Sequence, residues 1–278
     1  MKIVVVYDTL IRPDTTGTYC ENALRRLGHE VMRYEPLRGE RDHPEFRDWE
    51  GLPEGELYLQ IDDDLAYPFP RVNALKVYWC IDVHRMDKMY GGPATRWDKI
   101  KLFDRVFSAQ RDMSRKLNVP WLPLAYDPEV IHPIEGGEKI YDWCFVGNMT
   151  PERVAAVEQL KSQFANCFVG QAYGAAMNRI YNASRLAVNF SIANDINMRF
   201  FEAQGSGTPL ISNRPYNGED ELFDGMLYFD SVQELPRRVG ELLDDPSALA
   251  TSAQRQQACV SSRHTYLSRM RELLEFCR

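Results

Sequence analysis

The sequence predicts an α/β protein of two Rossmann-like domains that face each other across a cleft. Two observations indicate this fold class. Apolar runs of strand length alternate with helical stretches along most of the 278 residues. Proline and glycine then concentrate between Pro123 and Gly137, which predicts a boundary between an N-terminal domain at 1–124 and a C-terminal domain at 125–278.

The first forty residues predict the opening unit of the N-terminal domain. The run from Lys2 to Tyr7 is mainly apolar, as in a strand buried on both faces. A helix is expected from Thr18, because Thr18 and Glu21 fit a capping box, and Gly28 ends it. A second strand starts at His29, which completes a β-loop-α-β unit of a parallel sheet.

The same alternation predicts the remaining elements. In the N-terminal domain we expect strands at Leu57–Ile61, Leu75–Cys80, Arg105–Ser108 and Val119–Leu122, with a helix near Gln110–Lys116. In the C-terminal domain we expect strands at Trp143–Val146, Cys167–Val169, Leu186–Phe190, Pro209–Ser212 and Met226–Phe229. Its helices are expected at Pro151–Phe164, Ala175–Ala183, Met198–Gly205 and Val232–Leu243, and through the tail from Ser247 to Phe276.

Composition excludes several classes of protein. Lys and Arg number 33 against 40 Asp and Glu, so a general binder of nucleic acid or anionic membrane is disfavoured, although a local basic groove is compatible with this balance. No apolar run approaches the ~20 residues of a membrane span, and no signal peptide is evident, so we expect a cytoplasmic protein without integral membrane contact. The six cysteines form no C-x-x-C pair, which argues against a zinc ribbon or a thioredoxin-like site.

The most informative segment is I-N-M-R-F-F-E-A-Q-G-S-G-T-P-L-I-S at residues 196–212, which predicts a short helix, a glycine-rich stop and a buried strand. A helix N-terminus offers N–H groups that can hold a phosphate. Arg199 lies in the first turn, where a cation is unfavourable for the helix dipole, and this suggests an anionic partner. Glu202, one turn later, can accept hydrogen bonds from a ribose diol. The alternative is an Arg–Glu surface pair on a packing helix.

This segment resembles the donor-nucleotide motif of GT-B glycosyltransferases, specifically the group related to the spore-maturation protein CgeB. The R-x-F-E-A-x-x-x-G-x-P-L pattern of that group is matched by residues 199–210. Supporting matches are Y-D-x-x-F-V-G-N at 141–148 with Arg153, Y-N-A-S at 181–184, and H-T-Y at 264–266 with Arg269. The resemblance covers residues from about 125 onward, and the N-terminal half only by fold pattern and W-C-I-D-V-H at 79–84.

The resemblance implies a metal-independent transferase whose nucleotide-diphosphate sugar, a UDP-sugar by preference, is held mainly by the C-terminal domain. Glu202 would bind the ribose. Arg199, with the N–H groups near Asn197 and Met198, would face the diphosphate.

Three further residues belong to this expected donor site. Gly147 and Asn148 end the first strand of the domain, where a glycine lets backbone approach a phosphate or sugar. An ordinary strand-to-helix turn is the alternative for these two. Tyr173 follows the next strand and is a candidate for lining the base pocket.

Acid–base chemistry is expected from the N-terminal domain. Asp82 and His84 follow the strand Leu75–Cys80, at the carboxyl edge where open α/β sheets bind ligands. His84 is a candidate base or a stabiliser of the leaving diphosphate, and Asp82 a candidate base or a partner that orients His84. The alternatives are a loop cap for Asp82 and a structural role for His84. Asp8, after the first strand, is a second candidate base, and Gly17 in the same loop would let backbone approach the donor phosphates.

Two features leave the mechanism open. Asp62-Asp63-Asp64 contains an Asp-x-Asp that elsewhere holds Mg²⁺ or Mn²⁺, with a solvated acidic loop as the alternative. Many retaining GT-B enzymes carry a second Glu seven or eight residues before the ribose-binding one, and here those positions are Asp195 and Asn194. The stereochemical outcome is therefore not predicted.

Two other functions are compatible with the same scaffold: a sugar-nucleotide epimerase, and a non-catalytic nucleotide-sugar-binding or assembly protein. No cofactor is expected, since the nucleotide-sugar is a substrate. The acceptor stays open between a small molecule, a glycan, a protein and a modified nucleic-acid base.

Overall fold

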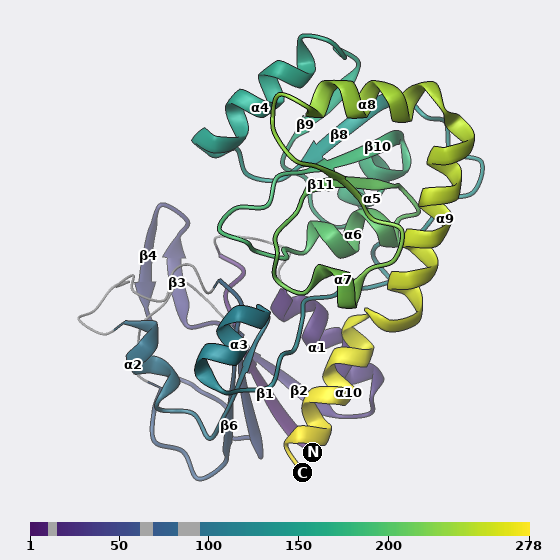
Figure 1. The fold of residues 1–278 in the computed structure, drawn as a ribbon. Coiled ribbons are helices and arrows are strands. Elements are labelled where there is room, and N and C mark those ends of the chain that lie inside the picture. Colours follow the sequence, from purple (N-terminus) through teal and green to yellow (C-terminus); the bar gives the residue numbers. More distant parts are fainter. Residues whose placement is uncertain (11–15, 62–68, 83–94) are drawn as a thin grey trace. The chain divides into compact units, whose positions relative to one another are not determined.

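The computed structural model describes residues 1–10, 16–61, 69–82 and 95–278, and the chain forms two compact units (Figure 1). Unit 1 contains residues 1–124 and 266–278, and unit 2 contains residues 125–265. The last helix, α10 (Tyr266–Phe276), therefore differs from its expected place in the C-terminal domain. It packs on α1 (Thr16–Arg26), where Tyr266 stacks on Tyr19 with ring centroids 5.2 Å apart.

Unit 1 is built on a five-stranded parallel sheet in the order β2-β1-β5-β6-β7. Its strands are β1 (Lys2–Val6), β2 (Glu30–Tyr34), β5 (Leu57–Ile61), β6 (Leu75–Cys80) and β7 (Arg105–Ser108). The expected strand at Val119–Leu122 is wrong, because this segment makes only an isolated bridge between Trp121 and Ser108. Pro120 lacks an N–H and so interrupts the ladder.

Several smaller elements of unit 1 lie outside the predicted pattern. The hairpin of β3 (Leu37–Glu40) and β4 (His43–Phe46) is polar and contains Pro44, so it carries no apolar strand signal. The helix α2 (Arg96–Ile100), after β6, was not predicted either, whereas α3 (Arg111–Leu117), after β7, confirms the helix expected near Gln110–Lys116.

The predicted capping box is also wrong, because α1 begins at Thr16 and Thr18 lies inside it. Glu21 instead has a buried carboxylate that accepts a hydrogen bond from the Tyr7 hydroxyl and forms ion pairs with Arg25 and Arg33, the latter at 2.8 Å. Burial alone would raise the pKa of Glu21, but the hydrogen bonds from Tyr7 and Arg33 outweigh it, and the pKa lies below its usual range.

Unit 2 has a second five-stranded parallel sheet, in the order β12-β11-β10-β8-β9. Its strands are β8 (Tyr141–Val146), β9 (Cys167–Gly170), β10 (Ser184–Asn189), β11 (Leu210–Asn213) and β12 (Leu227–Phe229). Its helices are α4 (Pro151–Lys161), α5 (Gly174–Asn182), α6 (Arg199–Gly205), α7 (Glu219–Leu222), α8 (Leu235–Asp244) and α9 (Pro246–Arg263).

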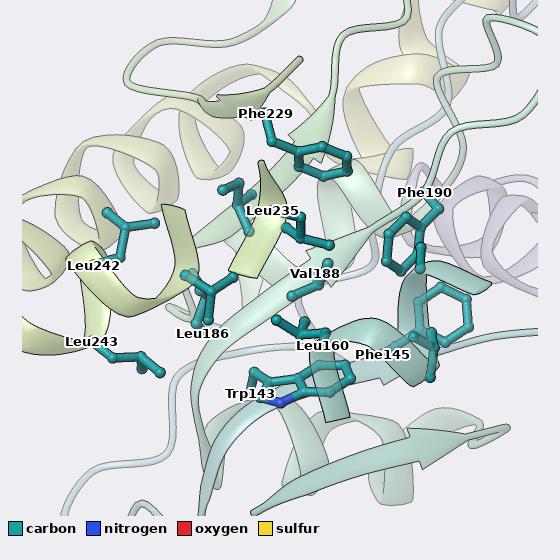
Figure 2. Packing of buried hydrophobic residues seen from close by; sticks show 14 of the residues in the cluster. Trp143, Phe145, Leu160, Leu186, Val188, Phe190, Phe229, Leu235, Leu242 and Leu243 are labelled. Atoms are coloured by element: carbon teal, nitrogen blue, oxygen red, sulfur yellow. The ribbon is translucent and has the colours of Figure 1, made fainter. Parts of the chain in front are cut away.

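The apolar core of unit 2 holds the ends of these strands in fixed positions. Figure 2 shows Trp143 of β8, Leu186 and Val188 of β10, and Leu235 and Leu242 of α8 meeting in this cluster. Each fully buried side chain of this size contributes about 1.5–3 kcal/mol. The polar residues that follow β8, β10 and β11 are thus presented from a rigid edge.

Candidate functional site

The candidate site lies at the carboxyl edge of the unit 2 sheet, where the neighbouring strands β8, β10 and β11 end. Arg199, the first residue of α6, bonds to two of these strands. Its Nε donates to the carbonyl of Val146 at 2.5 Å, and its Nη1 donates to Oδ1 of Asn189 at 2.5 Å. The guanidinium is therefore held in one orientation before any ligand arrives.

The structure shows a second reason for a glycine at position 147, besides the expected close approach of a ligand. A Cβ at this position would overlap Nη2 of Arg199 and lie 3.0 Å from its Cζ. The backbone φ of Gly147 is 154°, in a region that side chains disfavour. The glycine thus leaves room for Arg199 itself.

A second arginine lies beside the first. Arg153 of α4 is 8% exposed and donates to the carbonyls of Phe190 and Asn148, each at 2.9 Å. The two guanidinium carbons lie over the ring of Phe145, 5.5 Å from its centroid for Arg153 and 4.8 Å for Arg199.

The pair concentrates positive charge at this edge. Burial, and after it the charge of Arg199, lower the pKa of Arg153 to about 10. Within the described residues, neither arginine forms an ion pair within 4 Å, and the more distant negative charges of Asp195 and Glu152 offset only part of the lowering of the Arg153 pKa. A bound anion would relieve the repulsion between the two cations. The sequence analysis named Arg153 only as part of a motif match. Its position in the first turn of α4, shortly after the glycine that ends β8, is the sequence feature that could have identified it as a site residue.

At the N-terminus of α6, three N–H groups are bonded within the first turn, and the expected role of the N–H groups of Asn197 and Met198 themselves stays a prediction. The N–H of Arg199 donates to Oδ1 of Asn197 at 3.2 Å, that of Phe200 to the carbonyl of Asn197, and that of Phe201 to the carbonyl of Met198. Asn197 and Met198 therefore satisfy these three donors internally. Positive charge at this point comes from side chains more than from the helix end.

Glu202 lies one turn after Arg199 and is 7% exposed, so the two residues are not an exposed surface pair. Tyr181 of α5 is fully buried nearby. Burial raises its pKa well above the usual range, and the negative charge of Glu202 raises it further. The Tyr181 hydroxyl has no hydrogen-bond partner within the described residues.

The remaining C-terminal candidates follow β8 and β9 at the same edge of the sheet. Asn148 is exposed and bonds to Arg153 through its carbonyl. Tyr173 follows β9 and its hydroxyl donates to Oε1 of Gln171 at 3.1 Å. No described contact joins Tyr173 to Arg199 or Glu202.

Three residues of the supporting motif matches have structural roles. Asn182 accepts a hydrogen bond from the N–H of Ile134 and donates to the carbonyl of His132, which fixes the segment before β8. A ring nitrogen of His264 lies 2.7 Å from the carbonyl of Leu222, and the buried Arg269 donates to the carbonyl of Pro123 at 2.7 Å.

The N-terminal candidates are less assembled. Asp8 follows β1 and its Oδ1 accepts the N–H of Leu10 at 2.9 Å, while Asp82 follows β6 and is half-buried. Gly17 lies inside α1 and not in the expected loop, and a Cβ there would overlap the ring of Tyr7, so the glycine leaves room for that ring. His84 and the Asp62-Asp63-Asp64 run lie outside the described residues.

Across 1–10, 16–61, 69–82 and 95–278, no group of three or more His, Cys, Asp or Glu side chains is arranged to hold a metal ion. In the same part of the chain, no helix has both the length and the apolar character required to cross a membrane.

One family model matches part of the chain. Residues 144–275 match the family described as glycosyl transferase-like, and this segment contains Arg153, Arg199 and Glu202. No curated protein matches the chain.

Solved structures resemble the whole chain. A sucrose-phosphate synthase from Thermosynechococcus elongatus is 12% identical, with a TM-score of 0.67 over 100% of this chain and 98% of that one. Anabaena HepE, solved in complex with UDP and glucose, is 12% identical, with a TM-score of 0.67 over 100% and 99%. An alpha-glucosyltransferase, solved with UDP and a 13-mer DNA containing a HMU base, is 11% identical, with a TM-score of 0.67 over 99% and 98%.

The predicted fold class is therefore confirmed: two α/β units with parallel sheets form the fold of GT-B glycosyltransferases. The family match covers residues 144–275 of the chain, and the likeness to the solved structures is one of fold.

Proposed function

We propose that this protein transfers a sugar from a UDP-sugar to an acceptor and that unit 2 holds the donor. The observation that carries the proposal is the pair of arginines, Arg153 and Arg199, fixed at the strand ends with no carboxylate partner in the described chain. UDP is present in the structures of Anabaena HepE and of the alpha-glucosyltransferase, which supports the choice of nucleotide.

The arginines would act on the leaving group. Negative charge grows on the UDP oxygen as the bond to the sugar breaks, and a fixed cation at that point lowers the barrier. Arg199 is already oriented by Val146 and Asn189, so its reorganisation during the reaction would be small. With two guanidinium charges in place, the reaction needs no divalent metal to neutralise the diphosphate, and we propose a metal-independent transfer.

Glu202 would bind the ribose. Its carboxylate can accept two hydrogen bonds from a vicinal diol, and its burial strengthens such bonds by excluding water. Tyr173 and Asn148, at the ends of the adjacent strands β9 and β8, are proposed to contact the base and the donor backbone.

The acid–base step is assigned to unit 1. Asp82 and Asp8 follow parallel strands of unit 1 at the edge where such sheets bind ligands, and they remain the proposed bases together with His84. Membership of the CgeB-related group and a cytoplasmic location are proposed on the motif at 199–210 and on composition.

Two measurements test the proposal. Calorimetry with UDP should show that Arg199→Ala and Glu202→Gln each weaken binding by roughly ten-fold or more, because each removes a bond to a charged group. Arg237→Ala is a matched control, since this exposed arginine of α8 pairs with Glu234 and Glu241. Unchanged UDP affinity in both site variants would contradict the proposal.

Product analysis with UDP-sugars then separates the alternatives. Transfer to an added acceptor supports a glycosyltransferase. A new sugar-nucleotide formed without acceptor would indicate an epimerase, and tight UDP binding without transfer or donor hydrolysis would indicate a binding protein.

A further inference from the structure

A strained aromatic residue lies near the proposed donor site. Tyr216, in the loop between β11 and α7, is 78% exposed, more than any other large hydrophobic side chain in the described chain. Its φ is +55°, in the left-handed region that glycine adopts readily and tyrosine does not. Tyr216 thus exposes a large ring to solvent while its backbone adopts a conformation that is unfavourable for tyrosine.

Buried polar groups hold this conformation. Glu219 is 2% exposed, and its carboxylate accepts the N–H of Tyr216 at 3.1 Å and that of Asn217 at 2.8 Å. Arg214 stacks over the ring of Tyr228, 4.0 Å from its centroid, and bonds to Asp220. The loop is therefore fixed, and strain maintained in this way is typical of functional positions.

The loop is connected to the donor site through hydrogen bonds. Arg199 bonds to Asn189, Asn189 donates to Oγ of Ser212 at 2.9 Å, and the next residue, Asn213, exchanges two hydrogen bonds with Ser191. The buried Asn217 donates to the carbonyl of Asn194 at 2.9 Å. The loop that carries Tyr216 thus follows β11, and β11 bonds through Ser212 to Asn189, which also bonds to Arg199.

The charges around Tyr216 limit what can bind there. Asp220, Glu221 and Asp224 are exposed, and Asp195 is half-buried in the adjoining loop. The nearby cations Arg214 and Arg255 already pair with Asp220 and Asp224. This surface is unfavourable for a polyanion such as nucleic acid. The face of a tyrosine ring carries partial negative charge and attracts the C–H groups of a neutral pyranose.

We propose that Tyr216 is an acceptor-binding residue, whose ring stacks against a neutral pyranose of the acceptor next to the donor sugar. This inference rests on the proposed function and narrows its acceptor to a carbohydrate. Glu219 and Asn217 act as positioning residues, because they hold the loop without contacting the acceptor.

Saturation-transfer NMR on the full chain saturated with UDP tests the proposal. The probes are methyl glucoside, methyl galactoside, N-acetylglucosamine and maltose, with a single-stranded oligodeoxynucleotide as a separate arm. Tyr216→Gly removes the ring and suits the backbone, and Tyr216→Phe keeps the ring. Ile140→Ala is the matched control, because Ile140 is 56% exposed before β8, at the opposite edge of the same sheet.

We expect at least one saccharide to bind wild type, with roughly five-fold weaker binding in Tyr216→Gly and wild-type binding in Tyr216→Phe and Ile140→Ala. Calorimetry should show the same UDP affinity in all four proteins. No saccharide binding to wild type, equal binding by Tyr216→Gly, binding of the oligonucleotide alone, or a loss of UDP affinity in Tyr216→Gly would each overturn the proposal. If wild type binds no UDP, the proposed function fails instead.

Discussion

The two units use arginine in opposite ways. In unit 1, Arg25 and Arg33 surround the buried Glu21, so each positive charge has a carboxylate beside it. In unit 2, Arg153 and Arg199 bond only to carbonyls and an amide, and within the described chain no carboxylate pairs with them. Both clusters lie on similar parallel sheets. The difference indicates that the first cluster stabilises its unit, whereas the second carries positive charge that no ion pair compensates and that a ligand can use.

The largest expected effect comes from breaking the paired cluster. Glu21→Gln keeps the shape and removes the charge, leaving two arginines and the Tyr7 hydroxyl without their carboxylate. Because both arginines are partly exposed, water screens part of the loss, and we expect the unfolding free energy of unit 1 to fall by about 2–3 kcal/mol. UDP affinity should not change.

Urea unfolding followed by tryptophan fluorescence measures this effect. Trp143 is the one tryptophan of unit 2, so a Trp143→Phe background makes the signal report on unit 1. Glu241→Gln, an exposed glutamate paired with Arg237 and Arg238, is the control and should change stability little. An equal loss of unfolding free energy in Glu21→Gln and Glu241→Gln would contradict the claim that the buried ion pairs stabilise unit 1 more than the exposed pairs stabilise unit 2.

Gly147→Ala should disturb the unpaired cluster. The new Cβ would push the Arg199 guanidinium aside, and we expect a loss of stability of about 1–3 kcal/mol together with weaker UDP binding. The double variant Gly147→Ala/Arg199→Ala should recover part of the stability but not the UDP affinity, as thermal unfolding and calorimetry can show.

Gly137→Ala is a suitable control, because its Cβ would make only an ordinary contact with the carbonyl of Ile134. An unchanged UDP affinity in Gly147→Ala would mean that the placement of Arg199 is unimportant for binding.

The stability of unit 1 should depend on pH through Glu21. Its pKa is lower in the folded state than in the unfolded chain, so its contribution is fully present above the unfolded value of about 4.3 and is lost as pH falls through the folded value. The stability difference between wild type and Glu21→Gln should therefore be constant from pH 8 to about 5 and shrink at lower pH. A difference that grows on acidification would show that the pKa shift has the opposite sign.

The smallest effect is expected at Tyr181. Its buried hydroxyl has no partner in the described chain, so Tyr181→Phe should leave stability unchanged or raise it by about 0.5 kcal/mol, with UDP affinity preserved. Thermal unfolding and calorimetry check both values. A large loss of UDP affinity would show that the hydroxyl bonds to Glu202 or to the ligand in the bound state.

The fold was predictable where buried apolar runs determine the structure. The bounds of β5, β6 and β7 agree with the sequence prediction, because β5 is buried throughout and the carboxyl-terminal halves of β6 and β7 are buried. The β3–β4 hairpin was not predictable in this way, since its strands are polar and contain Pro44. The amphipathic pattern of α10 predicts a helix but does not specify which unit it packs on.

The site was predictable in its residues more than in its chemistry. The motif at 199–210 indicated Arg199 and Glu202, but the groups that hold Arg199 come from β8 and β10, which only the folded sheet brings together. Asn197 lies two residues before Arg199, the position of a side chain that caps a turn, and this local signal could have revealed that the helix donors are occupied.

The central claim is that Arg153 and Arg199 bind the diphosphate of the donor. Calorimetry with uridine, UMP and UDP on wild type and on Arg153→Ala/Arg199→Ala tests it most directly. We predict that wild type prefers UDP strongly over uridine, and that the double variant binds all three ligands with similar, weak affinity. A double variant that still prefers UDP over uridine as strongly as wild type would contradict the claim.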